Sequence, residues 1–232
     1  NKYQYKDESF NEWIERISGG NPKIAKLIRE RKFLFAGRIL ANRGLYRDNI
    51  KVTYSNCYVL EPPEDNLESI FDTAKNLART FSYGGGVGID ISKLRPNGAT
   101  VHNAAKTTSG AVSFMDLYSM TTGLIGQKGR RGALMISMDI SHPDIEEFID
   151  VKTDLQRVTK ANISVKVTDE FMNAVKNKEK YKCRFIIESS GEEIIKEVDA
   201  HELFMKLIKN NWDYAEPGIL FWDNIRKNHL LS

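Results

Sequence analysis

One run of apolar residues at helical spacing, followed closely by glycines and a short apolar segment, most constrains the fold of this chain. Seven apolar side chains fall on one stripe between residues 67 and 81, which is the spacing of an amphipathic helix. Three glycines at positions 84–86 end that helix, and residues 87–91 then have the length and character of a strand. A long helix that leads directly into a strand indicates an α/β protein.

The second half of the chain continues this alternation of helical and strand patterns. Residues 109–124 predict a second long helix, and residues 133–138 predict a buried strand. Residues 163–167 alternate apolar and polar side chains, which is typical of a half-buried strand. Residues 185–198 hold two strand-like segments on either side of Ser190-Gly191, which predicts a hairpin.

The first 35 residues show helical patterns only. Ser9 and Glu12 have the spacing of a capping box, and Asn21 precedes a proline that favours the first turn of a second helix. Residues 52–60 then predict a strand that buries Cys57. We therefore expect a helical region over residues 1–35 and an α/β region over residues 36–232.

Composition excludes several classes of protein. With 41% hydrophobic residues in 232, the chain can bury a sizeable core, and its apolar runs are far shorter than the roughly 20 residues of a membrane span. Its first ten residues are polar and indicate no signal peptide. Two cysteines fit a reducing cytoplasm. A net charge of +3 is too small to predict binding to nucleic acid or to a membrane.

Two segments have the chemistry of a phosphate or nucleotide site. Residues 127–132 form a basic loop bracketed by glycines, which could bind phosphate through arginine or could be a solvated turn. Asp65 and Asn66 precede the long helix, where a plain helix cap is the simpler interpretation and a bond to a ribose hydroxyl is the other. Arg95 could be a surface charge before a turn or a contact to an anion.

Cysteine and histidine positions give no metal site by themselves. Cys57 in a buried strand would ordinarily be a small hydrophobe, and no histidine has protease spacing to it. The spacing of His102, His142 and His201 matches no metal-binding motif, and the chain has no Cys-x-x-Cys. We therefore expect no metal.

Nine segments, taken in order, resemble one family. They are residues 37–42 (GRILAN), 55–57 (SNC), 83–88 (YGGGVG), 92–98 (SKLRPNG), 109–115 (SGAVSFM), 127–133 (QKGRRGA), 142–149 (HPDIEEFI), 167–172 (VTDEFM) and 216–218 (EPG). Their order and spacing are similar to the catalytic chain of ribonucleotide reductase, and most similar to its adenosylcobalamin-dependent class II.

The resemblance implies a fold. The family has a ten-stranded α/β barrel made of two five-stranded halves, so residues 36–232 would supply about half of the barrel, after the N-terminal helical region. In the family a later Asn-Pro-Cys segment supplies the cysteine that becomes a thiyl radical. That segment is not in this sequence, so the chain resembles the N-terminal half, either cut from a longer protein or one piece of a split protein, and inactive alone.

The resemblance also implies catalytic and substrate-binding residues. Cys57 matches the cysteine on the first barrel strand that reduces the ribonucleotide and ends in a disulfide with a distal cysteine. A thiol suits this chemistry because sulfur oxidises reversibly. Cys183 would be an ordinary packing residue. The positions lining the substrate would be Ala41, Ser55, Asn56 and Gly86.

A second implied site binds a deoxynucleoside triphosphate (dNTP) or ATP, which selects the substrate. Asp65, with Asn66 beside it, would meet the ribose of this effector, and Lys75 and Arg95 its phosphates. Gln127 and Arg131 would link the effector base to the substrate base.

The implied partners are a ribonucleoside diphosphate substrate, the dNTP effector, a second copy of the chain, the C-terminal half of the catalytic chain and a thioredoxin-type reductant. Two other functions stay open. One is a class I catalytic subunit that needs a metal-radical partner, and the other is a non-catalytic dNTP-binding module.

Overall fold

A computed structural model describes residues 3–101, 105–125 and 132–230 of the chain. These residues form two compact bodies. The first body comprises Asn1–Tyr58 with Tyr83–Gly85, and the second comprises Val59–Ser82 with Gly86–Ser232. The predicted boundary between residues 35 and 36 stays a prediction.

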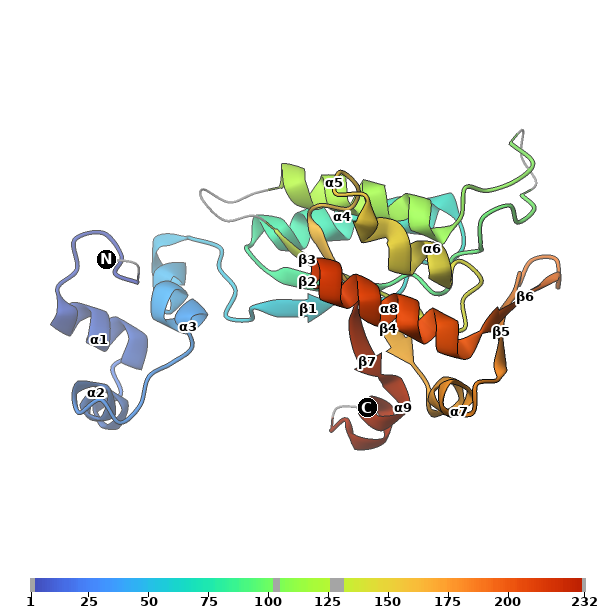
Figure 1. The fold of residues 1–232 in the computed structure, drawn as a ribbon. Helices are drawn as coiled ribbons and strands as arrows, with labels where there is room; N and C mark the ends of the chain where they lie inside the picture. The colour runs from blue at the N-terminus through green and yellow to red at the C-terminus, as the bar shows by residue number, and fades with distance from the viewer. Residues whose placement is uncertain (1–2, 102–104, 126–131, 231–232) are drawn as a thin grey trace. The chain divides into compact units, whose positions relative to one another are not determined.

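The first body is built from short helices around a small apolar core. Its elements are α1 (Phe10–Ser18), α2 (Pro22–Arg29), α3 (Gly37–Asn42) and the 3₁₀ turn η1 (Leu45–Asp48) (Figure 1). The predicted capping box is confirmed, because Ser9 accepts the N–H of Glu12 and the Glu12 carboxylate accepts the N–H of Ser9 at 2.8 Å. Ile14, Ile17 and Leu40 are buried between the helices.

The second body is organised by a five-stranded sheet in the order β1-β2-β3-β4-β7, although the edge strand β1 begins with Cys57 and Tyr58 of the first body. The strands are β1 (Cys57–Val59), β2 (Gly86–Asp90), β3 (Ala133–Asp139), β4 (Ala161–Val167) and β7 (Gly218–Phe221). β2, β3, β4 and β7 are parallel, and Ile89, Ile136 and Ile163 pair across three of them. A parallel sheet needs cover on its faces, and helices supply it.

The helices of the second body follow the predicted alternation. α4 (Leu67–Ser82) packs on β2, α5 (Phe114–Leu124) follows the short turn η2 (Ala111–Ser113), and both lie over the sheet (Figure 1). The remaining elements are α6 (Ile145–Asp150), η3 (Val151–Thr153), α7 (Asp169–Asn177), β5 (Lys180–Ile186), β6 (Glu193–Asp199), α8 (Ala200–Tyr214) and α9 (Trp222–Asn228). β5 and β6 form the predicted antiparallel hairpin.

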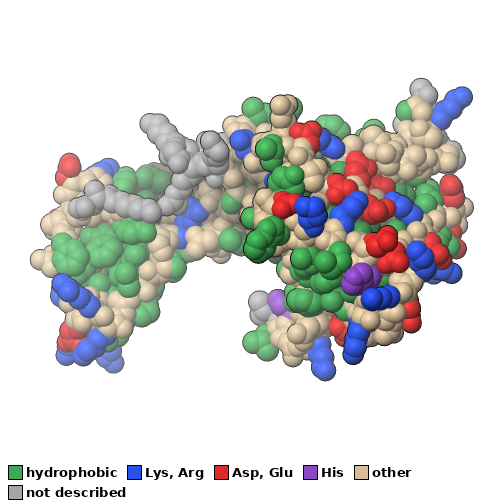
Figure 2. Space-filling view, in the orientation of Figure 1, with side chains coloured by type: hydrophobic (Ala, Val, Ile, Leu, Met, Phe, Trp, Pro, Cys, Tyr) green, Lys and Arg blue, Asp and Glu red, His purple; other side chains and the backbone are tan. Residues whose placement is uncertain are grey.

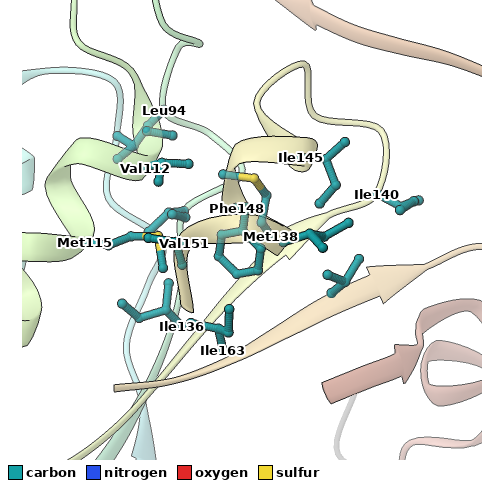
Figure 3. Close-up of a cluster of buried hydrophobic side chains, with 14 of the residues drawn as sticks. Leu94, Val112, Met115, Ile136, Met138, Ile140, Ile145, Phe148, Val151 and Ile163 are labelled. Carbon is teal, nitrogen blue, oxygen red and sulfur yellow. The ribbon is translucent and has the colours of Figure 1, made fainter. Parts of the chain in front are cut away.

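Apolar side chains from strands and helices fill the space between the sheet and its cover. Figure 3 shows Met115 of α5, Ile136 and Met138 of β3, and Phe148 of α6 meeting in this core. All four are fully buried. On the face drawn in Figure 2, acidic and basic side chains are interspersed over the second body.

Two local predictions are wrong. The strand predicted over residues 52–60 is limited to Cys57–Val59, and Cys57 is exposed instead of buried. Residues 163–167 do form a strand, but Lys166 is buried like its neighbours Val165 and Val167, so the half-buried pattern ends after Ser164. The helices α3 and α9 were not predicted.

The α/β fold with a parallel sheet is confirmed, while the ten-stranded barrel stays a prediction. Within the described residues, no helix is both long and apolar enough to cross a membrane.

Candidate functional site

Asp65 and Arg95 form a partly buried ion pair at the start of α4. The Nε of Arg95 lies 2.7 Å from Oδ2 of Asp65, and the backbone N–H of Arg95 donates to Oδ1 at 3.0 Å. The two side chains are 25% and 15% exposed, respectively. Arg95 Nη1 also donates to the carbonyl of Thr100 at 2.6 Å. Arg95 is therefore held in one place, with part of its guanidinium still available as a donor.

Asn66 is the residue that caps α4. Its Oδ1 accepts the N–H of Ser69 at 2.8 Å, and its carbonyl accepts the N–H of Ile70 at 3.1 Å. The two polar residues before the helix therefore have different roles. Asn66 satisfies the helix end, and Asp65 is left to bind Arg95.

Two cavities of the second body meet at these residues. The larger, of about 780 Å³, is lined by carboxylates and cations, namely Glu64, Asp65, Glu188, Lys93, Arg95 and Arg184. The smaller, of about 260 Å³, has apolar walls from Leu67, Ile70, Leu94 and Phe114. Both include Asp65, Asn66, Arg95 and Ser189. The larger volume is in the range of about 300–1,000 Å³ that small-molecule sites occupy.

The cavity cations are already paired. Lys93 Nζ lies 2.6 Å from Glu64 Oε1, a contact that raises the pKa of Lys93 through its hydrogen bond to that carboxylate. Arg184 pairs with Glu193 of β6. An anionic ligand would therefore join existing ion pairs or displace a carboxylate.

The other predicted effector residues are placed differently. Lys75 is exposed on α4, pairs with Asp72 of the same helix, and lies outside the linings of these two cavities. Gln127 and Arg131 lie outside the described residues. The structure thus brings together Asp65, Asn66 and Arg95, which are three of the six.

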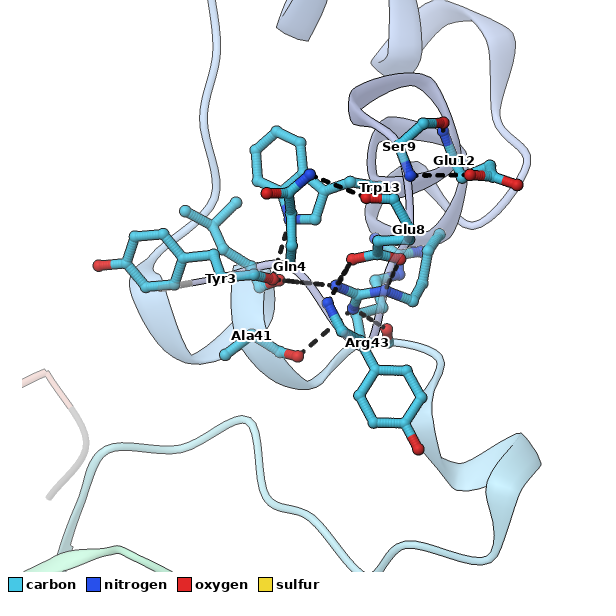
Figure 4. A network of polar contacts seen from close by, with 11 residues as sticks. Tyr3, Gln4, Glu8, Ser9, Glu12, Trp13, Ala41 and Arg43 are labelled. Carbon is cyan, nitrogen blue, oxygen red and sulfur yellow. Dashed lines mark hydrogen bonds and ion pairs between the residues drawn. The ribbon is translucent and has the colours of Figure 1, made fainter. Parts of the chain in front are cut away.

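Four of the five predicted substrate and catalytic residues belong to the first body. Ala41 is in α3, and its carbonyl accepts a bond from Arg16 Nη1 at 3.4 Å. Arg16 also pairs with Glu8 at 2.7 Å and donates to the carbonyl of Arg43 at 2.6 Å, a network that Figure 4 shows from close by. Its hydrogen bond to Glu8 lowers the pKa of that carboxyl group. This network fixes α3 against α1.

Ser55, Asn56 and Cys57 follow one another at the end of the first body. The N–H of Ser55 donates to Thr53 Oγ1 at 3.1 Å, and Asn56 Oδ1 accepts from Arg38 Nε at 3.3 Å. Arg38 was not among the predicted residues. Its signal was its place in the motif at residues 37–42. Gly86 belongs to the second body, where it begins β2 opposite Ala133.

The two cysteines differ in environment. Cys57 is exposed, whereas Cys183 is buried, with its Sγ 3.6 Å from the carbonyl of Ile140. Burial raises the pKa of the Cys183 thiol to about 11. A thiol reacts as its thiolate, so Cys183 suits packing and Cys57 is the thiol open to chemistry.

A further charged cluster lies at the carboxyl ends of parallel strands. Lys166 Nζ of β4 lies 2.8 Å from Asp90 of β2 and 3.0 Å from Asp139 of β3. Ser137 donates to Asp90 at 2.7 Å, and Lys166 Nζ lies over the ring of Trp222. This cluster was not predicted, although two aspartates ending neighbouring strands were its signal. Within the described residues, no group of three His, Cys, Asp or Glu side chains could hold a metal.

Comparison with known proteins assigns the chain to a family. Residues 55–232 match the model of the ribonucleotide reductase barrel domain. A vitamin B12-dependent ribonucleoside-diphosphate reductase of Thermoplasma acidophilum is 40% identical over 75% of this chain and 22% of its own length. One of Mycobacterium tuberculosis is 35% identical over 97% of this chain and 30% of its own.

A more distant relative is the ribonucleoside-diphosphate reductase subunit alpha of Synechocystis, which is 29% identical over 86% of this chain and 30% of its own length. The chain thus spans between about a fifth and a third of the length of these curated relatives. The family match covers the whole five-stranded sheet and the cavities beside Asp65, and on this evidence the chain belongs to the ribonucleotide reductase family.

Proposed function

We propose that the full protein reduces ribonucleoside diphosphates to deoxyribonucleotides by radical chemistry, with adenosylcobalamin as the radical source. The observation that carries this proposal is the family match over the sheet, together with two relatives named as vitamin B12-dependent diphosphate reductases. A class I radical source is the alternative, and the Synechocystis relative is named only as a ribonucleoside-diphosphate reductase subunit alpha, with no mention of vitamin B12. None of the described histidines lines either cavity beside Asp65. The chemical role that we propose for this chain belongs to the thiol of Cys57.

Cys57 is the residue we assign to reduction of the substrate. The ribose 2′ hydroxyl leaves as water, and two thiols, Cys57 and a distal cysteine, give up two electrons and two protons and become a disulfide. A thioredoxin-type partner would then reduce that disulfide. The exposure of Cys57 supports this role, because both the substrate and the second thiol must reach its sulfur. Ala41, Ser55, Asn56 and Gly86 are proposed to line the substrate.

The test of this assignment is a pair of cysteine variants in the full protein. Cys57→Ser should abolish steady-state formation of deoxyribonucleotide, because serine keeps the shape but cannot form the disulfide. Cys183→Ser should retain turnover and serves as the matched control. Turnover at the wild-type rate in Cys57→Ser would contradict the assignment. Binding of nucleotide without any turnover in the wild-type full protein would instead favour a non-catalytic nucleotide-binding module.

We further propose that the cavities beside Asp65 bind the allosteric effector, a dNTP or ATP. Asp65 uses both of its oxygens on Arg95, yet a carboxylate oxygen can accept more than one bond, so a ribose hydroxyl can share it. Arg95 keeps unused donors for phosphate. Asn66 contacts the effector only at the rim, since its side chain caps α4. Lys75, Gln127 and Arg131 remain proposed contacts to phosphate and base.

Isothermal titration of the four dNTPs and ATP into wild-type and variant protein tests this site. Arg95→Ala should weaken binding about tenfold or more, because each charge-assisted bond contributes about 1.5–3 kcal/mol. Asp65→Ala should weaken it less, through loss of a ribose contact. Lys209→Ala, which removes an exposed ion pair on α8, is the matched control. Equal affinities in all four proteins would contradict the site.

A second copy of the chain is the proposed partner at α4 and α5. Each helix keeps large apolar side chains exposed, Leu67 and Phe71 on α4 and Met120 and Leu124 on α5. Sedimentation of the full protein with and without saturating effector should show a dimer that Phe71→Glu weakens. A wild-type protein that remains a monomer with effector bound would contradict this interface.

A further inference from the structure

The turn between β3 and α6 contains a histidine whose two ring nitrogens are both engaged. His142 is 2% exposed. Its Nε2 lies 2.8 Å from the carbonyl of Leu94, and its Nδ1 accepts the N–H of Asp144 at 3.0 Å. A carbonyl can only accept and an amide can only donate, so the proton is on Nε2 and the imidazole is neutral.

The same turn holds the segment that carries Arg95. His142 binds the carbonyl of Leu94, and the carboxylate of Asp144 accepts the N–H of Asn97 at 2.9 and 3.1 Å. Arg95 therefore lies between two residues whose backbones are fixed by one turn. Gly110, with a φ of +85°, closes the other side: a Cβ there would lie 2.6 Å from the nitrogen of Asn97 and 2.7 Å from Oδ2 of Asp144. Only glycine fits at position 110 without moving Asn97 or Asp144.

The turn also reaches a second part of the cavity lining. The N–H of Arg184 donates to the carbonyl of Ser141 at 2.7 Å. The ring of Phe185 meets the ring of His142 edge to face, with 5.5 Å between centroids. Arg184 and Phe185 line the larger cavity together with Arg95. One buried turn thus connects the β5 side of the cavity to the side that carries Arg95.

We propose that His142 is a positioning residue of the cavity beside Asp65, which sets the distance between the Arg95 segment and the Phe185 side and so controls affinity for the effector. This inference rests on the proposed effector site. His142 touches neither the ligand nor Asp65 itself. It acts through its hydrogen bond to the carbonyl of Leu94 and through its ring contact with Phe185.

Two substitutions separate the two bonds of the ring. In His142→Gln the side-chain amide can still reach and donate to the carbonyl of Leu94. In His142→Asn the shorter amide can replace only the local bond to the N–H of Asp144. We therefore expect His142→Asn to weaken binding of the best-bound dNTP about tenfold, and His142→Gln to stay within about threefold of wild type, as measured by calorimetric titration of dATP, dGTP, dCTP and dTTP into the full protein.

Leu207→Ala distinguishes positioning from general loss of stability. Leu207 is fully buried on α8 and lies outside the linings of both cavities, so its truncation should lower the thermal midpoint and leave affinity unchanged. Should His142→Asn fail to fold, Asp144→Ala and Asp144→Asn test the same segment through Asn97, with loss expected in the first and retention in the second.

The outcomes are distinct. Three results would each overturn the positioning role while leaving the effector site in place. The first is wild-type affinity in His142→Asn, and the second is an equal loss of affinity in His142→Asn and His142→Gln. The third is a loss of affinity in Leu207→Ala equal to that in His142→Asn when the two variants have the same thermal midpoint. Failure of every dNTP to bind wild-type protein would overturn both the site and the inference that rests on it.

Discussion

Protonation of His142 is coupled to the stability of the second body. Burial lowers the pKa of His142 below its ordinary value of about 6.5, although the carboxylates of Asp144, Asp139 and Asp90 act in the opposite direction. Two of these carboxylates are themselves paired with Lys166. The buried ring therefore stays neutral at a pH where the same ring in the unfolded chain has gained a proton.

The expected result is a loss of stability in acid. Below pH about 6.5 the unfolded chain binds more protons than the folded one, so the free energy of unfolding should fall by up to about 1.4 kcal/mol per pH unit until the folded pKa is reached. Above pH about 6.5 this contribution is fully present. Urea unfolding of wild type and His142→Gln at several pH values between 8 and 5 gives the contribution of His142 as the difference between the two free energies of unfolding. A difference that does not change with pH would contradict the prediction.

The two thiols should differ in reactivity. Iodoacetamide at pH 8 should alkylate the exposed Cys57 within minutes and should modify Cys183 only after unfolding, because Cys183 is buried and its pKa is raised to about 11. Peptide mass spectrometry of labelled protein, with Cys57→Ser as control, measures both sites. Equal labelling rates in the folded protein would show that Cys183 is accessible.

At the scale of single residues, the sequence placed Asp65 and Asn66 correctly before a helix but could not divide their roles. The preference for an N-cap residue depends only on the local sequence, and it is about equal for Asp and Asn. The partner that decides between them, Arg95, lies 30 residues away. Burial of Lys166 was missed for the same reason, since its partners Asp90 and Asp139 come from other strands.

The cap of α4 can be tested as a property of that helix. Asn66→Ala should lower the free energy of unfolding by about 1 kcal/mol, because the N–H of Ser69 loses its acceptor. Asn66→Asp should retain it, since a carboxylate oxygen caps equally well and suits the positive end of the helix. Asn76→Ala, at an exposed position of the same helix, is the control. An Asn66→Ala midpoint equal to that of Asn76→Ala would show that the cap contributes nothing.

Elements with strong local patterns were predicted well, and short ones were not. α4 has a continuous apolar stripe that needs no distant partner to be recognised. α9 has no buried residue, and α3 is only six residues long with Leu40 as its one buried side chain, so neither leaves a periodic signal. β1 is three residues long. Its apolar neighbours in the sequence suggested a longer strand, and the exposure of Cys57 depends on what surrounds it in space.

At the scale of the whole molecule, the two bodies have separate apolar cores. The first is a small cluster around Ile14, Ile17 and Leu40, and the second is a much larger one between the sheet and its helices. Residues 50–56 carry neither helix nor strand. A segment of this kind is a preferred site of proteolysis. After cleavage there, the two fragments should differ in their resistance to further digestion, because each contains one of the two cores.

Chymotrypsin at low concentration should therefore cut the 232-residue chain first after Tyr54, which is 46% exposed. The product would begin at Ser55, where the match to the barrel domain also begins. This fragment retains the complete larger core, so it should resist further digestion and unfold cooperatively, whereas the released segment keeps only the small core and should be degraded. Mass spectrometry identifies the products, and Tyr54→Ser should slow the first cut. If the fragment from Ser55 disappears as fast as it forms, the larger core depends on the first body for its stability.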